Sequence, residues 1–173
     1  KSALKETKGD VEDAITFLRK KGLAKADKKS DRNTSEGKVG TYIHPGGKIG
    51  VMLQLNCETD FVANTPDFEG LVRDIAMHIA AAKPRFATRE EVTEEVLGKE
   101  REIFAHQAKE SGKPENIVEK IVTGKMEKFY EENCVLEQAF VKDTNVTIGE
   151  LIKQKIALLG ENINIGQFSR FEI

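Results

Sequence analysis

The chain has 173 residues, of which 39% are hydrophobic and 32% charged, and its formal net charge at pH 7 is −2. This composition is sufficient for a folded core and excludes a chain that is disordered throughout. The small net charge gives no general attraction to nucleic acid or an anionic membrane, and no apolar run approaches the roughly 20 residues that span a bilayer. We therefore predict a folded protein with neither nucleic acid nor membrane as a direct partner.

The first 22 residues predict a small helical unit, and residues 23–37 predict a charged, solvated helical linker. Asp10 can cap a helix whose apolar positions follow helical spacing, and Gly22 can end it. Such a helix needs partners for its apolar stripe. Because acidic residues interrupt the lysines of 23–37, a basic arm that binds RNA is the less favoured interpretation.

Residues 38–173 predict an α+β domain in which helices cover one face of an antiparallel sheet. Its first part is a hairpin from Val39 to Cys57 with a Pro-Gly-Gly turn. A helix over 66–82 follows, with Thr65 as N-cap and a proline in its first turn.

The middle of this domain predicts charged helices over 88–131. We expect a capping box at Thr88 and breaks at Gly98 and at 111–114. Residues 134–141 form a short apolar run and predict a strand.

The last part predicts one helix and one strand. Thr147 and Glu150 form a capping box, and Gly160 can end the helix that follows. In 162–173 the apolar residues change parity along the chain, which predicts a strand with a bulge at Gly166.

The segment 56–63, Asn-Cys-Glu-Thr-Asp-Phe-Val-Ala, lies between the predicted second strand and the helix over 66–82. A turn at this point places Phe61 beside Asp60 and can project the ring outward as a rigid probe. The alternative is that Phe61 packs beneath the next helix and Asp60 caps a turn, since most phenylalanines are buried. Local residues alone leave both interpretations open.

Several kinds of chemistry lack their residue patterns. Neither G-x-x-x-x-G-K-[ST] nor G-x-G-x-x-G occurs, so we expect no nucleotide site. His44, His78 and His106 stand far apart without neighbours at metal-ligand spacing. The carboxylates of 90–102 alternate with basic residues, which is typical of a solvated helix face. We therefore predict no catalytic residue, no cofactor and no metal.

Segment 56–63 closely resembles the signature of the elongation factor Ts family, the guanine-nucleotide exchange factors of translation. One such block is weak evidence, whereas an ordered set that covers nearly the whole chain is strong. The further blocks, in the family's order, are Ala76-Met77-His78-Ile79-Ala80 with Lys83-Pro84-Arg85-Phe86, Ser111-Gly112-Lys113-Pro114, and Gly160-Glu161-Asn162-Ile163.

The resemblance implies that the partner is the translational GTPase elongation factor Tu and that the chain promotes release of its GDP. It implies that Phe61 acts as an apolar wedge between two helices of the GTPase near its Mg²⁺ site. Asp60 would face the phosphates and Mg²⁺, while its neighbours hold the turn. His44 and His78 are expected as secondary contacts. The implied partner-binding residues are Thr59, Asp60, Phe61 and Val62.

The resemblance also concerns the N-terminus and the compartment. Residues 1–22 resemble part of a three-helix, ubiquitin-associated-like module that docks on the GTPase in the family, and the first helix of that module is missing here. The implied compartment is the bacterial cytoplasm or an organelle matrix or stroma. There we expect Cys57 and Cys134 to stay reduced.

We further predict a homodimer. Longer family members resemble two related core subdomains in one chain, one with the counterpart of segment 56–63 and the other with the counterpart of block 76–80. Here one core carries both. The final strand ends in Phe168, Phe171 and Ile173, so apolar surface is left for an isologous contact along the sheet and this strand. Ser169 stands where some short members carry a linking cysteine, so we predict no intersubunit disulfide there.

Two other function classes stay open at this point. One is an RNA- or protein-interaction module that uses the N-terminal helices and linker. The other is an enzyme with an unrecognised site in the glutamate-rich helices. Stoichiometric binding to a nucleotide-free GTPase would favour the exchange factor over both, and salt-sensitive RNA binding would favour the first.

Overall fold

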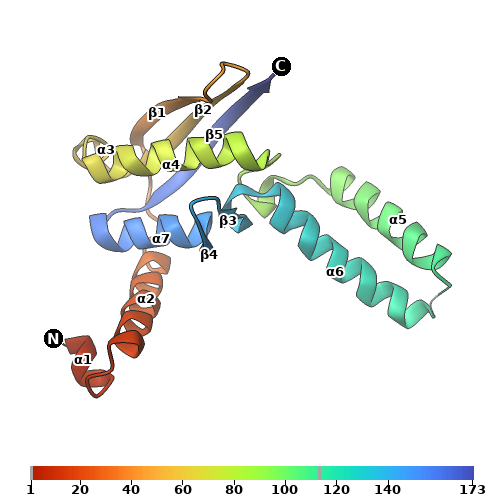
Figure 1. The fold of residues 1–173 in the computed structure, drawn as a ribbon, viewed down its shortest axis with the longest axis horizontal. Helices are drawn as coiled ribbons and strands as arrows, with labels where there is room; N and C mark the ends of the chain where they lie inside the picture. Colours follow the sequence, from red (N-terminus) through yellow and green to blue (C-terminus); the bar gives the residue numbers. More distant parts are fainter. Residues whose placement is uncertain (1, 113) are drawn as a thin grey trace.

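The computed structural model describes residues 2–112 and 114–173 and has an α+β architecture (Figure 1). Its first half contains α1 (Ser2–Glu6), α2 (Val11–Asp27), β1 (Glu36–Ile43), β2 (Ile49–Cys57), α3 (Asp60–Ala63) and α4 (Pro66–Ala82). Its second half contains the 3₁₀ turn η1 (Arg89–Glu91), α5 (Glu94–Glu110), α6 (Glu115–Asn133), the 3₁₀ turn η2 (Val135–Glu137), β3 (Ala139–Phe140), β4 (Asp143–Thr147), α7 (Ile148–Leu159) and β5 (Ile163–Glu172). None of the helices in the described part is both long and apolar enough to cross a bilayer.

An antiparallel sheet of three strands, in the order β1–β2–β5, forms the centre of the protein. Val51, Leu53 and Leu55 of β2 are buried on one face, whereas Met52 on the other face is exposed. This alternation is expected for a sheet with one covered face. α4 packs on β1 and β2, and α7 packs beside it (Figure 1). The predicted fold, an antiparallel sheet covered by helices on one face, is confirmed.

Helix α4 forms as predicted and supplies much of the core. The hydroxyl of Thr65 accepts a hydrogen bond from the backbone N–H of Phe68 at 3.2 Å, which caps the helix. β1 approaches α4 so closely that a Cβ on Gly40 would lie 2.1 Å from Cγ1 of Val72. Only glycine therefore fits at this crossing without a rearrangement of the core.

The bulge predicted in β5 is confirmed. Gln54 pairs with Gln167 and Leu55 pairs with Ile165, so Gly166 has no partner on β2. Because of this extra residue, Ile165 and Phe168 both reach the covered face although their positions differ in parity.

Helix α7 begins and ends as predicted. The hydroxyl of Thr147 accepts from the backbone N–H of Glu150 at 3.1 Å, and the Glu150 carboxylate accepts from the backbone N–H of Thr147 at 3.2 Å. Gly160 ends the helix with a φ of 84°, a left-handed conformation that favours glycine.

Helix α2 is longer than its sequence predicts. Asp10 caps it as expected, with Oδ1 accepting from the backbone N–H of Asp13 at 2.8 Å. The predicted end at Gly22 is wrong, because the helix continues to Asp27. At Gly22 it packs on α7, where an added Cβ would lie 3.5 Å from Cβ of Ala157. Packing thus outweighs the roughly 1 kcal/mol that glycine costs inside a helix.

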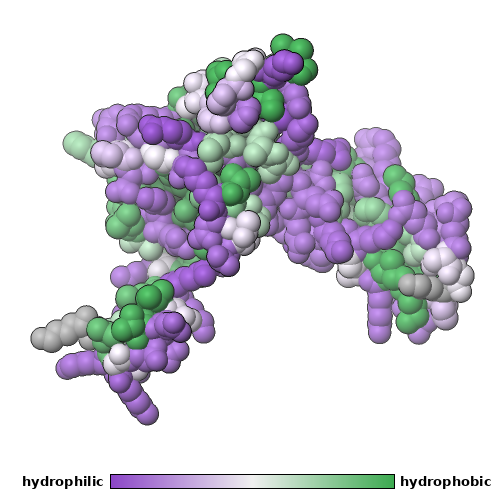
Figure 2. Space-filling model, viewed as in Figure 1, coloured by the Kyte–Doolittle hydropathy of each residue, from purple (hydrophilic) through white to green (hydrophobic). Residues whose placement is uncertain are grey.

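The arm formed by α1 and α2 leaves apolar side chains uncovered, and they gather at the lower left of the space-filling view (Figure 2). A single amphipathic helix needs a partner for such a stripe. The ubiquitin-associated-like module and the boundary after residue 22 stay predictions. The exposed apolar residues of the arm are Leu4, Val11, Ile15 and Leu18.

The strand predicted over 134–141 is largely wrong. Cys134 forms an isolated bridge with Phe86, η2 follows, and only the two residues of β3 are extended as a strand. The backbone N–H of Val135 donates to the carbonyl of Phe86 at 2.9 Å, so the chain pairs with the segment after α4. A short apolar run does not reveal this partner.

Helices α5 and α6 form an antiparallel hairpin that projects from the rest of the protein (Figure 1). The predicted capping box at Thr88 and break at Gly98 are wrong: Thr88 precedes η1 and makes no side-chain cap, whereas Thr93 caps an uninterrupted α5. The predicted end near Ser111 is confirmed. The hairpin has a small core of its own, formed by Val92, Leu97, Met126, Phe129 and Cys134.

Candidate functional site

Residues 59–62 lie on a projection of the surface between β2 and α4. Residues 60–63 form the one-turn helix α3 in place of the open turn that the sequence predicts. Asp60 is exposed, and 82% of the surface of Phe61 is exposed. The alternative in which Phe61 packs beneath the next helix is therefore wrong.

The inner side of α3 holds its backbone in place. Ala63 is buried, and Val62 packs against the main core. The hydroxyl of Thr59 accepts from the backbone N–H of Val62 at 3.4 Å, and the hydroxyl of Thr65 donates to the carbonyl of Val62 at 2.8 Å. α3 is thus joined to the start of α4, and its two outer side chains leave from an ordered backbone.

An exposed phenylalanine on an ordered backbone is suited to binding. Leaving such a side chain in water forgoes roughly 1.5–3 kcal/mol of burial free energy. Aromatic side chains with few rotatable bonds are frequent anchors of protein interfaces. The carboxylate of Asp60 beside Phe61 adds a negative charge to the same projection. The pair can therefore enter a pocket that is apolar on one side and polar on the other.

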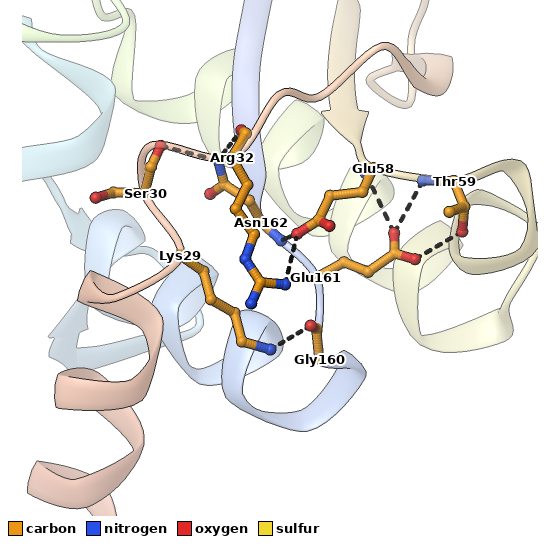
Figure 3. A network of polar contacts seen from close by, with 8 residues as sticks. All are labelled: Lys29, Ser30, Arg32, Glu58, Thr59, Gly160, Glu161 and Asn162. Carbon is orange, nitrogen blue, oxygen red and sulfur yellow. Dashed lines mark hydrogen bonds and ion pairs between the residues drawn. The ribbon is translucent and has the colours of Figure 1, made fainter.

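A group of polar side chains behind α3 holds its N-cap residue, Thr59 (Figure 3). Oε2 of Glu161 accepts from the backbone N–H groups of Glu58 and Thr59 at 3.2 and 3.0 Å. Oε1 of Glu161 accepts from the hydroxyl of Thr59 at 2.6 Å. In return, the carboxylate of Glu58 accepts from the backbone N–H of Asn162 at 2.7 Å.

The same group reaches the segment that follows α2 (Figure 3). The side-chain amide of Asn162 donates to the carbonyls of Ser30 and Arg32 at 3.0 and 2.9 Å. The guanidinium of Arg32 lies 3.5 Å from the carboxylate of Glu58. Three segments far apart in the sequence therefore meet directly behind α3.

Sequence reasoning missed this polar group. The block Gly160-Glu161-Asn162-Ile163 contributes to the family resemblance, but no role for Glu161 or Asn162 follows from it. The only local signal is the position of two carboxylates: Glu58 directly follows the strand predicted to end at Cys57, and Glu161 directly precedes the strand predicted over 162–173. Their meeting depends on the pairing of β2 with β5, which the sequence does not reveal.

His44 lies at the opposite end of the sheet from α3. Its backbone N–H donates to the carbonyl of Ile49 at 2.9 Å, so it stands beside the first residue of β2. The nine residues of β2 separate it from the start of α3, which corresponds to about 30 Å of strand. The ring is exposed, with Nδ1 3.1 Å from the hydroxyl of Tyr42. The structure does not bring His44 together with Asp60 and Phe61.

His78 is completely buried on α4. Its Nε2 lies 2.9 Å from Oε1 of Gln138, and its Nδ1 accepts from the backbone N–H of Val141 at 3.4 Å. Because the first partner accepts and the second donates, the neutral ring carries its proton on Nε2. In this conformation the ring has no surface for a partner, and direct contact would require the segment 138–141 to move.

The environment of His78 predicts a dependence of stability on pH. Burial lowers the pKa of the His78 ring below its usual 6.5, against the smaller raising effect of the Gln138 hydrogen bond. The unfolded chain therefore binds this proton more tightly, so the contribution of His78 to stability is complete above pH 6.5 and declines as the pH falls below it. The slope is at most about 1.4 kcal/mol per pH unit.

Urea unfolding of the His78→Gln variant between pH 7.5 and 5.5 tests this expectation. We expect a flatter dependence of the unfolding free energy on pH than in the original chain, because most carboxylates titrate below this window. His44→Gln, which changes an exposed ring, should keep the original slope. Equal slopes in all three proteins would contradict the assignment to His78.

Neither cysteine is arranged as a nucleophile. Cys57 and Cys134 are both free and buried. Burial is the main cause that raises the pKa of both thiols, that of Cys134 to about 11, so the reactive thiolate is disfavoured. Across residues 2–112 and 114–173, no group of three or more histidine, cysteine or acidic side chains could hold a metal ion.

Comparison with known proteins agrees with the sequence blocks. The profile of the family described as Elongation factor TS matches residues 7–173. The chain is 58% identical over 173 residues to elongation factor Ts of Fervidobacterium nodosum, and the aligned region covers 100% of this chain and 88% of that protein. It is 56% identical over 173 residues to elongation factor Ts of Solibacter usitatus, covering 100% of this chain and 82% of that protein. The chain therefore belongs to the elongation factor Ts family of translation elongation factors.

Proposed function

We propose that this chain is a guanine-nucleotide exchange factor that binds elongation factor Tu carrying GDP and promotes release of the GDP. The observation that carries the proposal is the exposed Phe61 beside Asp60 on α3, in a chain of this family. No chemical step is assigned to the chain, which acts by binding. The relatives are bacterial, and this supports the bacterial cytoplasm as the setting.

The mechanism follows from linkage between two binding events. A protein that binds the nucleotide-free GTPase more tightly than the GDP-loaded form must lower the affinity of the GTPase for GDP by the same factor. It shifts the population toward the open form only by that difference in affinity. The contacts that matter are therefore those made only when the nucleotide site is distorted.

Each residue from Thr59 to Val62 has a defined part in this mechanism. Phe61 enters an apolar pocket between two helices of the GTPase and holds them apart. Asp60 faces the side of the phosphates and Mg²⁺, where a second negative charge disfavours the bound diphosphate. Thr59 and Val62 keep the probe in its orientation, as their hydrogen bond within α3 supports. The exposed apolar stripe of α1 and α2 supports a second docking surface on the same GTPase.

The direct test is the release of fluorescent GDP from elongation factor Tu in the presence of excess unlabelled nucleotide. We expect release to accelerate with the concentration of the chain, and a stoichiometric complex to form when nucleotide is removed. Unchanged release at saturating concentration would contradict the proposal. Salt-sensitive binding to RNA without acceleration would instead favour the interaction module.

The uncovered face of the sheet supports the proposed homodimer. Register places Ile43, Gly50 and Phe171 in one row across the three strands, and Thr41, Met52 and Ser169 in the next. Val39, Ile43, Met52 and Phe171 on this face are all more than half exposed. Exposed apolar side chains gathered on one sheet face are typical of an interface, and two copies related by a twofold axis can cover each other.

A charge at the centre of this face should abolish the dimer. Met52→Glu places a carboxylate where it would be buried in the contact without a partner, which is strongly unfavourable. We expect light scattering to give twice the chain mass of 19.3 kDa for the original protein and the single mass for the variant. Leu158→Glu, on the exposed side of α7, should remain dimeric. An original chain that is monomeric at micromolar concentration would contradict the homodimer.

A further inference from the structure

We infer that Glu161 is a positioning residue for nucleotide exchange: its carboxylate fixes Thr59, the N-cap of α3, and thereby the direction of Asp60 and Phe61. The inference rests on the proposed function. The side chain of Glu161 is half-buried behind Asp60 and Phe61. Glu161 therefore acts through Thr59 and not by contact with the GTPase.

The position of Glu161 at the end of the sheet explains its effect. Cys57 and Ile163 form the last pair of the ladder between β2 and β5, and beyond them the two strands separate. At this point the N–H groups of Glu58 and Thr59 no longer face a backbone carbonyl across the ladder. The carboxylate of Glu161 replaces that carbonyl and accepts from both of them. Pairing is thus continued by a side chain up to the start of α3.

The backbone that carries Glu161 is also held in place. The next residue, Asn162, is 4% exposed and donates its backbone N–H to Glu58. The side chain of Asn162 is fixed in turn by the carbonyls of Ser30 and Arg32. Glu161 is therefore presented from an ordered loop and not from a mobile one, which is the condition for a residue that orients another.

Helix α3 requires such support because it has only four residues. A helix this short is not stable alone, since forming its first turn costs more than its few hydrogen bonds return. Without the three bonds to Glu161, the peptide between Glu58 and Thr59 can rotate. Phe61 lies two residues further on, and a displacement of about 1 Å at a reacting or binding group can reduce a rate by about 100-fold.

Exchange assays on single and double variants test the inference. We expect Glu161→Ala to slow the release of fluorescent GDP from elongation factor Tu by about 10- to 100-fold at a temperature where circular dichroism shows the variant folded. Glu161→Gln should keep most of the rate. Its amide oxygen can accept from the two N–H groups, and its amide nitrogen can donate to the hydroxyl of Thr59.

The double variant separates positioning from general stability. If Glu161 acts only by orienting Phe61, then adding Glu161→Ala to Phe61→Ala should slow exchange little beyond Phe61→Ala alone. Glu91→Ala is a matched control. Its carboxylate accepts from the backbone N–H of Ala87 at 2.7 Å and lies on a different segment, so exchange should be unchanged.

Two results would overturn the inference. One is that folded Glu161→Ala exchanges nucleotide at the same rate as the original chain. The other is an equal slowing by Glu161→Ala with and without Phe61, which would indicate a structural role. If Glu161→Ala does not fold, Glu161→Asp carries the test, because it keeps the charge but shortens the reach, and an original rate would again overturn the inference. An original rate for Phe61→Ala would overturn the wedge role of Phe61, whereas a failure of the original chain to accelerate GDP release would overturn the proposed function itself.

Discussion

Replacing Phe61 with alanine should weaken binding to nucleotide-free elongation factor Tu by about 2–4 kcal/mol, or roughly 30- to 1000-fold. Truncation of a buried aromatic anchor has this effect in other interfaces. The melting temperature should remain nearly unchanged, because 82% of the Phe61 surface is already exposed in the free chain. Titration calorimetry and thermal unfolding measure these two quantities, and GDP-release kinetics measure the effect on exchange.

The control for this variant is Leu158→Ala, which truncates another exposed apolar side chain, on α7. We expect the control to exchange nucleotide at the original rate. A Phe61→Ala variant with unchanged exchange and a sharply lower melting temperature would show that the ring stabilises the folded chain and does not bind the GTPase. That combination would remove the main support for the wedge.

Replacing Phe68 with alanine should have the opposite profile. Phe68 lies in the first turns of α4 and is completely buried in the main core. Phenylalanine-to-alanine changes in cores cost about 3–5 kcal/mol of unfolding free energy, because a cavity remains. For a chain of this size that corresponds to a fall of roughly 6–20 °C in the melting temperature.

Phe61→Ala is the matched comparison for Phe68→Ala, since the two variants lose the same atoms seven positions apart. Chemical unfolding at 25 °C measures both. A loss below about 1 kcal/mol for Phe68→Ala would mean that the core closes around the missing ring. Exchange by Phe68→Ala should be assayed only where the variant is folded, so that loss of structure is not mistaken for loss of contact.

Several parts of the fold that depend on neighbouring residues were predictable, although the capping box at Thr88 and the break at Gly98 were not. Thr65 and Thr147 cap their helices, Asp10 caps α2 and Gly160 ends α7, because each device works within four residues of chain. The bulge at Gly166 was also predictable, since a change of parity must be absorbed somewhere within the strand.

The parts that depend on distant segments were not predictable. Gly22 reads as a helix end, yet contact with α7 carries the helix past it. Residues 134–141 are apolar enough for a strand, but Val135 and Leu136 donate their backbone hydrogen bonds to the segment after α4. At the site, a phenylalanine on a turn is equally compatible with burial and exposure. The support from Glu161 depends on the pairing of two strands that lie far apart in the sequence.

The bulge in β5 has a consequence for how the chain can change in length. A regular strand cannot lose a residue without turning the side chains beyond that point to the other face of the sheet. β5 is different, because Gly166 has no partner and Ile165 and Gln167 already oppose consecutive residues of β2. Deleting Gly166 would straighten the strand while Phe168 stays toward the helices. The bulge is thus a position where β5 can be shortened by one residue with both faces of the sheet preserved.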